Sequence, residues 1–456
     1  MRYDFMENKE LYWIKLGEIR NFVLSLQKIS SMSVEEIAKI IADQREEIMS
    51  EDMRAYCERF EASQLSPDSS LAQVVIGVRR SGKSTLCTKF LVDNAVDCAF
   101  VNFDDERLAA MQTEDLNRLL EAIYIVYGNI DCLFFDEIQN VEAWPLFVNR
   151  LLRQKKRIFL TGSNSKLLSN ELMTHLTGRH NKVELYPFSF AEFCRINSVD
   201  TVSITTKAVG LRQNALHKYL AIGGFPELQK EDNPKNYIDG LFNAIIRNDI
   251  ARRFKIRQEE VLRKMAAYLA DNFAQEFSAV AVGKLFGVSN HTAEKYFGYL
   301  KEAFLFVGVK KFSYKASERV RNEKYYVVDV AMASERNDTF SLENLGWRLE
   351  NVVCIELLRR YHHQYAEVFY YKEKSFEIDF LVAKNGMVQE LIQVSYQIAS
   401  EKTRQREINS LVQGAKKFNC RKLTLITFST EEVIKKDGET INIIPATKWL
   451  TTRTNE

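Results

Sequence analysis

The stretch Gly77-Val78-Arg79-Arg80-Ser81-Gly82-Lys83-Ser84, followed by Thr85, decides the fold of this 456-residue chain. It has the G-x-x-x-x-G-K-[ST] pattern of a phosphate-binding loop. The apolar run 74–76 predicts a buried strand before the loop, and residues 84–92 predict a helix after it. This strand–loop–helix setting is what the pattern requires before it indicates a nucleotide triphosphate site, and a chance glycine-rich turn is the poorer interpretation.

The loop residues have separate roles in the predicted site. Glycine at 77 and 82 permits backbone angles that let the loop curl round an anion, whose charge the loop N–H groups and the following helix N-terminus stabilise. Lys83 is expected to reach the β- and γ-phosphates, and Ser84 to ligate Mg²⁺. ATP and Mg²⁺ are therefore the predicted ligands. The candidate nucleotide-binding residues are Gly77, Arg79, Arg80, Ser81, Gly82, Lys83, Ser84 and Thr85.

The composition is that of an ordinary globular chain, with 46% hydrophobic and 27% charged residues. Its length predicts about two to three domains. A net charge of +2 gives no overall field for nucleic acid. The seven cysteines are scattered without a C-x-x-C pair, which indicates a reducing compartment. We expect no signal peptide, membrane span or membrane partner, and a cytoplasmic location, because neither a leader-like apolar segment after Met1 nor a run approaching 18 apolar residues is present.

A second acidic motif follows the loop at the end of the apolar run 131–137. Asp136 and Glu137 end this predicted strand in the form of a Walker B motif. Asp136 is expected to hold the Mg²⁺ shell, and Glu137 to orient and deprotonate the attacking water. Strands often end in acidic residues, which is the alternative interpretation, but the upstream loop favours the catalytic one.

Further strands are predicted at 98–103, 158–161 and 183–186. A complete strand between the loop strand and the Walker B strand indicates the P-loop branch with an inserted strand and a catalytic glutamate. Asn164, or alternatively Ser163, follows the strand at 158–161 and is expected to sense the γ-phosphate. Strands that alternate with helices predict an α/β fold with a parallel sheet and a ligand at the strands' carboxyl ends.

The ordered motifs resemble a prokaryotic AAA-type ATPase family in which a domain of unknown function habitually follows. They are residues 77–85, 135–139, 160–164, 176–179 and 185–193. The resemblance covers about residues 70 to 430 and implies ATP binding and hydrolysis. It also implies that Arg179 is the basic residue facing the γ-phosphate, in cis or from a neighbouring chain. A fork-shaped guanidinium suits phosphate oxygens.

The turn Gly223-Gly224-Phe225-Pro226-Glu227 resembles the lid contact of STAND-type ATPases, although a rigid turn between helices is an equal interpretation.

Ser33 and Glu36 predict a capping box for a helix at 34–48. The predicted organisation is a helical segment at 1–70, an AAA-type core at 71–195, a helical lid at 196–240, a winged-helix domain at 241–335 and a nuclease-like domain at 336–456.

Residues 278–286 and 290–304 fit a helix–turn–helix followed by a hairpin that ends near Asp329. The charges on the would-be recognition helix cancel, whereas a DNA-reading helix is normally more basic. The basic run 247–257 suits phosphates, a subunit interface or the ATP site equally well. DNA is therefore the weaker partner prediction, and a protein partner or further copies of the chain are favoured.

The last segment resembles the PD-(D/E)XK nuclease core, because a helix with Glu350 precedes strands at 366–371, 376–382 and 390–396. Glu350 and Asp379 match that pattern. The third strand carries Gln393-Val394-Ser395 where the nuclease needs an acid and a lysine, so both are missing. We therefore expect a nuclease-like fold without cleavage activity. The overall expectation is an ATPase acting as a conformational switch, with an ATP-regulated DNA-binding protein or a metal-dependent nuclease as alternatives.

Overall fold

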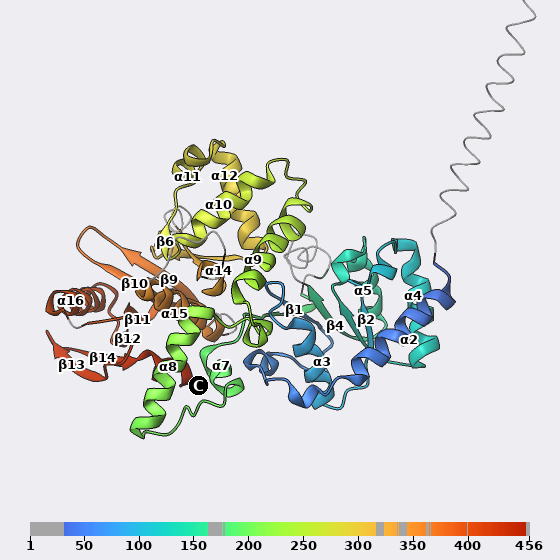
Figure 1. Cartoon of the computed structure of the whole chain (residues 1–456), viewed down its shortest axis with the longest axis horizontal. Coiled ribbons are helices and arrows are strands. Elements are labelled where there is room, and N and C mark those ends of the chain that lie inside the picture. Colours follow the sequence, from blue (N-terminus) through green and yellow to red (C-terminus); the bar gives the residue numbers. More distant parts are fainter. Residues whose placement is uncertain are drawn as a thin grey trace, which may run out of the picture.

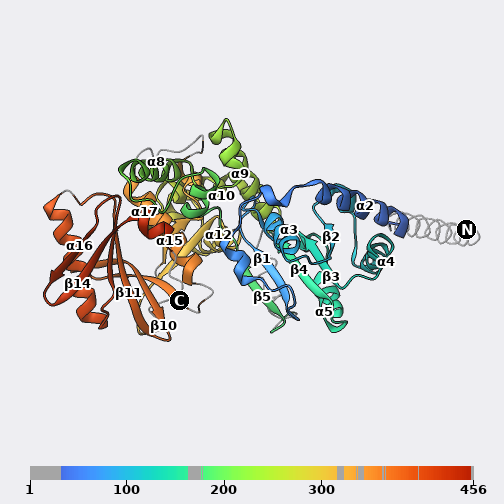
Figure 2. The same cartoon turned by 90° about the horizontal axis from the view of Figure 1, so that it is seen from below.

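The structure is a computed structural model that describes residues 32–162, 176, 178–315, 323–334, 336, 344–361, 364, 366–398 and 400–452. Two sheets lie at opposite ends of the molecule, and a group of helices lies between and above them (Figure 1). The view turned by 90° shows the same separation of the two sheets (Figure 2). No helix in the described ranges is long and apolar enough to cross a membrane.

The first sheet has five parallel strands in the order β2-β3-β4-β1-β5. The predicted α/β fold with a parallel sheet is therefore confirmed. In space β4, which comes later in the chain, lies between the loop strand β1 and the Walker B strand β3, whereas β2 forms the edge. The strands are β1 (Ala72–Ile76), β2 (Ala99–Asn102), β3 (Cys132–Asp136), β4 (Arg157–Gly162) and β5 (His180–Glu184).

Helices cover this sheet and bury its apolar strands. Helix α2 begins with the predicted capping box, in which Glu36 N–H donates to Ser33 Oγ (3.1 Å) and Ser33 N–H donates to Glu36 Oε2 (2.8 Å). It packs on α4 and β2, so the segment before the phosphate loop belongs to the nucleotide unit. The elements are α2 (Val34–Ser50), η2 (Met53–Ala55), η3 (Phe60–Gln64), α3 (Lys83–Asp93), α4 (Leu116–Tyr127) and α5 (Trp144–Arg153).

A helical region follows the first sheet and includes the predicted Gly223-Gly224 turn. Gly224 N–H donates to Asp329 Oδ2 (2.8 Å), and a Cβ at Gly223 would lie 1.8 Å from Asp329 Oδ1, so this close approach requires glycine. The helices are α7 (Phe190–Ile196), α8 (Thr206–Ile222), η8 (Glu227–Lys230) and α9 (Pro234–Ala244), which continues as the π-helical turn η9 (Ile245–Ala251).

The two helices predicted at 278–286 and 290–304 and the hairpin after them appear where the sequence predicts them. The elements of this part of the chain are four helices and three antiparallel strands in the order β6-β8-β7. They are α10 (Glu259–Asp271), β6 (Gln275–Glu276), α11 (Ala279–Phe286), α12 (Asn290–Glu302), β7 (Phe306–Lys311), β8 (Glu323–Val327) and α14 (Ala331–Ser334).

The C-terminal elements extend that sheet rather than starting a separate one. Strand β7 pairs in parallel with β9 at Lys310 and Lys311. Nine described strands therefore form one sheet, in the order β13-β14-β12-β11-β10-β9-β7-β8-β6. This sheet contains strands from both sides of the predicted domain boundary at 335/336. The elements are α15 (Leu345–Tyr361), β9 (Ala366–Lys372), β10 (Glu377–Lys384), β11 (Met387–Ser395), α16 (Glu401–Phe418), β12 (Leu423–Thr427), β13 (Glu432–Lys436), β14 (Glu439–Pro445) and α17 (Ala446–Thr451).

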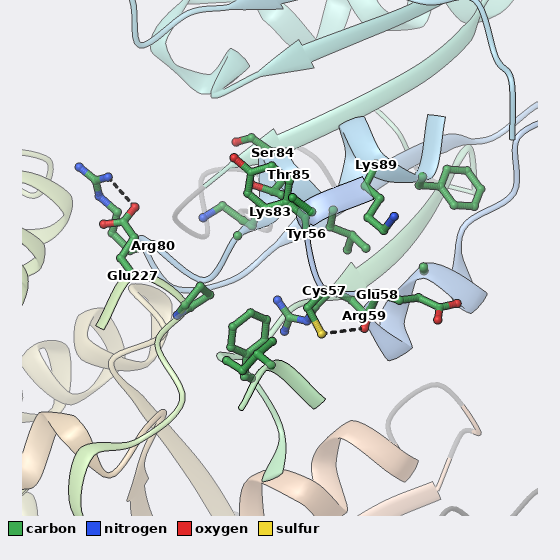
Figure 3. Close-up of a pocket in the computed structure, with 18 of the residues that line it drawn as sticks. Tyr56, Cys57, Glu58, Arg59, Arg80, Lys83, Ser84, Thr85, Lys89 and Glu227 are labelled. Carbon is green, nitrogen blue, oxygen red and sulfur yellow. Dashed lines mark hydrogen bonds and ion pairs between the residues drawn. The ribbon is translucent and has the colours of Figure 1, made fainter. Parts of the chain in front are cut away.

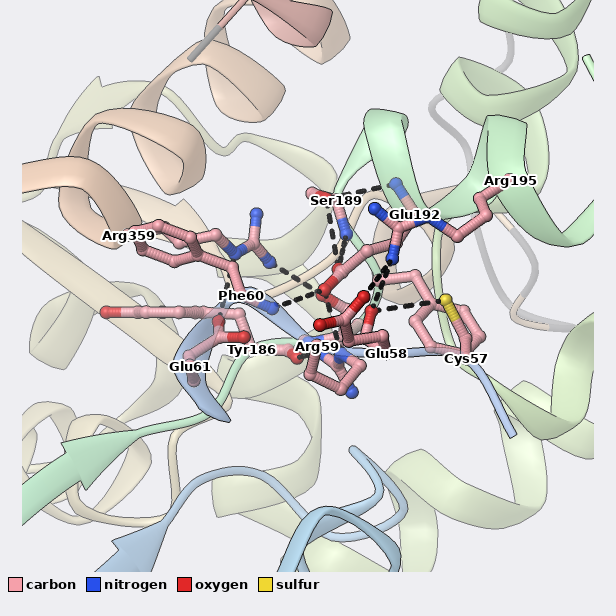
Figure 4. A network of polar contacts seen from close by, with 12 residues as sticks. Cys57, Glu58, Arg59, Phe60, Glu61, Tyr186, Ser189, Glu192, Arg195 and Arg359 are labelled. Carbon is pink, nitrogen blue, oxygen red and sulfur yellow. Dashed lines mark hydrogen bonds and ion pairs between the residues drawn. The ribbon is translucent and has the colours of Figure 1, made fainter. Parts of the chain in front are cut away.

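A buried ion-pair network ties this C-terminal region to the nucleotide unit (Figure 4). The guanidinium of Arg359, on α15, donates to Glu61 Oε1 (3.1 Å), Glu356 Oε2 (2.9 Å) and the carbonyl oxygen of Pro187 (2.6 Å). Burial opposes its charge, but Glu61 and Glu356 outweigh burial and raise the Arg359 pKa. One side chain therefore joins three segments that lie far apart in the chain.

Replacing Arg359 with Met should lower the free energy of unfolding by about 3–5 kcal/mol, because Glu61 and Glu356 would lose a buried partner. Calorimetric unfolding measures the change. Lys416→Met is the matched control, since its pair with Asp437 (3.5 Å) is exposed, and such pairs contribute about 0–1 kcal/mol. Equal losses in the two variants would contradict a structural role for the buried network.

Candidate nucleotide site

The phosphate loop is shaped by one close backbone approach and by two residues with left-handed backbone angles. A Cβ at Gly77 would lie 2.1 Å from the carbonyl oxygen of Leu185, which follows β5. Gly82 has a φ of +91° and Arg80 a φ of +66°, in the left-handed region that glycine adopts most easily. The loop therefore leaves β1 in a tight curl and delivers Lys83 as the first residue of α3.

Two polar side chains of the loop are buried in a way that suits an anion. Lys83 is 5% exposed, and among the described residues its Nζ donates to the carbonyl oxygen of Val78 (3.1 Å), within the loop. Burial lowers the Lys83 pKa, against the opposing fields of Glu137 and Asp136. Ser81 Oγ is buried without a hydrogen-bond partner among the described residues. An anionic phosphate would stabilise the buried ammonium, so these residues fit the predicted triphosphate.

Asp136 lies at the end of β3 beside the loop. Ser84 Oγ donates to Asp136 Oδ1 (2.8 Å), and Thr161 Oγ1 donates to the same oxygen. Burial raises the pKa of Asp136 to about 6, and the neighbouring Glu137 adds to this effect. A hydroxyl and a carboxylate oxygen side by side are hard ligands of the kind that Mg²⁺ takes together with nucleotide phosphates, so Ser84 and Asp136 fit that ion.

Glu137 adopts a conformation that is unusual for its residue type. Its φ of +53° lies in the left-handed region, which costs a non-glycine residue about 1–2 kcal/mol. Its N–H donates to Thr161 Oγ1 (3.3 Å), and Gln139 Nε2 donates to its carboxylate. The strained turn takes Glu137 out of the strand, and the residue lines the pocket next to Asp136.

A pocket of about 1560 Å³ opens at this end of the sheet (Figure 3). Most of the predicted nucleotide and metal residues line it, namely Arg79, Arg80, Gly82, Lys83, Ser84, Thr85, Asp136 and Glu137. Residues of the segment before the loop form another part of the wall, namely Ala55, Tyr56, Cys57, Glu58, Arg59 and Phe60. The structure thus brings together two motifs that lie about 50 residues apart, as parallel strands require.

Arg59 is a site residue that the sequence did not reveal. It is 7% exposed, and its guanidinium donates to the carbonyl oxygens of Ser81 (3.0 Å) and Tyr186 (2.6 Å) and to Glu192 Oε1 (3.0 Å). Burial disfavours the Glu192 carboxylate, but Arg59, Arg359 and two backbone N–H groups together outweigh burial, so the Glu192 pKa falls to about 2. Arg59 therefore fixes the backbone of the phosphate loop at Ser81. No local pattern in the sequence marks this lone arginine.

Thr161 is a second residue that sequence reasoning missed. It is fully buried near the end of β4, and its hydroxyl contacts both Asp136 and the backbone of Glu137. The predicted γ-phosphate sensor, Asn164, and its alternative Ser163 lie outside the described residues. A strand between β1 and β3 must end between the two motifs, but this order is set by the tertiary structure and not by a local pattern in the sequence.

Arg179 lies far from this pocket within the chain. It is exposed, and its carbonyl oxygen accepts from Ala72 N–H (2.9 Å) at the beginning of β1. The phosphate loop follows the other end of that five-residue strand, roughly 15 Å away at about 3.3 Å per residue. The structure therefore does not bring Arg179 to the phosphate loop in cis, and a contribution from a neighbouring chain stays a prediction.

Carboxylates from later helices pair with both loop arginines. Arg79 donates through Nε (3.3 Å) and Nη2 (3.2 Å) to Asp249, which lies on η9 and is 4% exposed. Arg80 Nη1 donates to Glu227 Oε1 (2.8 Å) in an exposed pair. The phosphate loop is thus in direct contact with two elements outside the first sheet.

Three family models match successive parts of the chain. Residues 69–194 match the AAA domain family. Residues 213–343 and 345–449 match two domains of unknown function, DUF8612 and DUF4143. The chain is thus an AAA P-loop protein with a two-part C-terminal region.

Two relatives match this chain over most of their length. The uncharacterized protein MJ1544 of Methanocaldococcus jannaschii is 35% identical over 402 residues, which cover 83% of this chain and 87% of the relative. An uncharacterized protein of Haemophilus influenzae is 33% identical over 401 residues, covering 84% and 95%. The chain belongs to the same family as these two proteins.

Among solved structures, the RuvB Holliday junction branch migration motor of Thermotoga maritima matches 52% of this chain and 81% of its own. The identity is 17% and the TM-score is 0.27, a likeness too low to support an argument.

Asp136→Asn should stabilise the nucleotide-free protein at neutral pH. The Asp136 pKa is raised from 3.8 to about 6, so its charged form costs stability above that pH and costs nothing below about pH 4. The variant should be up to about 3 kcal/mol more stable at neutral pH, and its advantage should shrink as the pH falls through 6. Thermal unfolding of both proteins over a pH series without Mg²⁺ measures this, and a pH-independent difference would contradict it.

Proposed function

We propose that this chain binds ATP with Mg²⁺ and hydrolyses the γ-phosphate. The observation that carries the proposal is the position of Glu137. This residue has a strained backbone conformation and lies beside Asp136 in the pocket that the phosphate loop lines. A carboxylate there is suited to orient and deprotonate a water molecule for attack on phosphorus. P-loop proteins that only bind nucleotides do not need such a group.

The other side chains have supporting roles in this mechanism. Lys83 and the loop N–H groups neutralise phosphate charge, and Ser84 and Asp136 hold Mg²⁺, which offsets the negative charge of the phosphate oxygens when bound. Thr161 orients Asp136 and the Glu137 backbone through its hydroxyl. Asn164 as a γ-phosphate sensor and Arg179 of a second copy as a phosphate ligand complete the proposed site.

We further propose that nucleotide binding acts as a conformational switch. The paired residues Arg79–Asp249 and Arg80–Glu227 support this, because a triphosphate in the loop would meet the same two guanidinium groups. In the turn that follows α8, Gly224 N–H donates to Asp329, which follows the later hairpin. These contacts connect the phosphate loop to the C-terminal region, so a shift of the loop on nucleotide binding can displace the later elements.

The order of the later elements supports the winged-helix and nuclease-like assignments, which we propose for residues 241–335 and 336–456. Of the basic run proposed for phosphates, Arg247 pairs with Glu259 (3.2 Å) and Arg253 with Glu302 (3.8 Å). These pairs favour a structural or protein-contact role over DNA binding.

The seven cysteines are all free, which supports a reducing, cytoplasmic location.

Glu137→Gln should retain ATP binding and lose at least about 10²-fold in turnover, because the amide does not accept the proton of the attacking water. Phosphate release under saturating ATP and calorimetric ATP binding measure the two properties. Lys83→Ala is the comparison variant, which should lose tight binding itself since its ammonium no longer neutralises the phosphates. Hydrolysis by Glu137→Gln at the parental rate would overturn the catalytic assignment.

Asp249→Asn should uncouple the middle helices from the nucleotide while leaving ATP bound, since it removes the charge that ties η9 to Arg79. In the parent, ATP should change the amide hydrogen exchange of residues 245–271, and in the variant most of this change should be absent. Glu227→Gln, which alters the exposed pair with Arg80, is the control and should retain it. An unaltered ATP response in Asp249→Asn would argue against coupling through this contact.

A further inference from the structure

A buried lysine occupies the acidic site of the C-terminal sheet. Lys324 Nζ lies 2.6 Å from Glu377 Oε1 and 3.6 Å from Glu350 Oε1. Its side chain is 7% exposed, and its ammonium lies 5.4 Å from the ring centre of Tyr370. The lysine comes from β8, whereas the carboxylates come from α15 and β10. It therefore enters from the unit that precedes the acidic residues in the chain.

The acidic residues themselves are held from several sides. Tyr326, two residues after the lysine on β8, donates its hydroxyl to Glu350 Oε1 (2.8 Å). Val394 N–H donates to Asp379 Oδ2 (2.9 Å). In the sheet order β7 and β9 separate β8 from β10, so the side chains of Lys324 and Glu377 meet across two intervening strands.

Charge explains why a cation belongs at this place. Burial raises the pKa values of Glu350 and of Asp379, so both carboxyl groups are costly to ionise. Burial also disfavours the Lys324 ammonium, but the fields of Glu350, Asp379 and Glu377 outweigh burial and raise its pKa. The lysine therefore lowers the pKa of all three carboxyl groups, against the effect of burial.

The third strand offers no competing cation. Gln393, which stands where a nuclease of the resembled type has a carboxylate, accepts from Asp379 N–H (2.7 Å) and donates to Glu407 (2.6 Å). Both ends of its amide are thereby used inside the sheet. Among the described residues, no group of three or more His, Cys, Asp and Glu side chains is arranged to hold a metal ion.

We propose that Lys324 is the built-in cation of the site formed by Glu350, Glu377 and Asp379, and that its ammonium occupies the position a divalent ion would take. The site is then an ion-paired joint between the β6-β8-β7 unit and the C-terminal unit, in which the half-exposed Lys372 also contacts Glu377 (3.3 Å). Removal of the ammonium leaves a cluster of carboxylates that takes a hard divalent cation instead.

Mn²⁺ uptake by the full chain tests this proposal. The experiment uses the Asp136→Asn background without nucleotide, so that the predicted Mg²⁺ ligand of the phosphate loop is removed. The parent of this series should take up no Mn²⁺ at the C-terminal site, as measured by electron paramagnetic resonance of the free ion. Lys324→Met should melt lower by roughly 5 °C, take up about one Mn²⁺ per chain and regain stability with it. Adding Asp379→Asn should abolish that uptake.

Lys422→Met is the matched control, because Lys422 also pairs with a buried carboxylate of this unit, Glu390 (3.0 Å), but is itself half exposed. It should take up no Mn²⁺. Mn²⁺ bound by the parent and lost with Asp379→Asn would overturn the proposal, since the site would then hold a metal beside the lysine. A folded Lys324→Met that takes up no Mn²⁺ would overturn it as well.

A second variant covers the case in which Lys324→Met does not fold. Lys324→Met combined with Glu350→Gln removes both members of a buried pair, which costs less than removing one. It should therefore yield folded protein, and Lys324→Arg, which keeps a cation, should melt like the parent. Failure of the double variant to fold while Lys324→Arg folds would show that the lysine acts through something other than these carboxylates.

Discussion

Two buried guanidinium groups hold this protein together, and both bind the short segment between β5 and α7. Arg59 donates to the carbonyl oxygen of Tyr186 and Arg359 to that of Pro187. Each also requires a buried carboxylate, Glu192 for Arg59 and Glu61 for Arg359. Because a buried charge is tolerated only when it is paired, neither the segment before the phosphate loop nor helix α15 can leave without destabilising the nucleotide unit.

This arrangement places the nucleotide pocket in contact with the rest of the chain. Arg59 supports the phosphate loop through Ser81, and Asp249 contacts it through Arg79. Asp329, whose pKa burial raises to about 6, accepts from Gly224 and lies five residues after Lys324. The same stretch of the hairpin therefore touches the turn beside the nucleotide pocket and the acidic joint of the C-terminal sheet.

Local patterns in the sequence were sufficient for most helices and strands and for the two nucleotide motifs. The capping box of α2 and the bounds of α15 follow from residues that are neighbours in the chain. Thr161 was missed because its role depends on β4 lying between β1 and β3. Arg59, Asp249 and Lys324 were missed because their partners lie 22 or more residues away in the chain, and no spacing rule connects them.

The sequence by itself determined the phosphate-binding loop, the Asp136–Glu137 pair and the alternation that builds a parallel sheet, because each depends on residues close together in the chain. Only the tertiary structure decided which charges meet. It assigned Arg59 to the back of the loop, placed Arg179 at the opposite edge of the sheet, and brought Lys324 to the carboxylates of the last unit. Charges act through space and over a few ångströms, so their partners are fixed by how the layers pack and not by their order in the sequence.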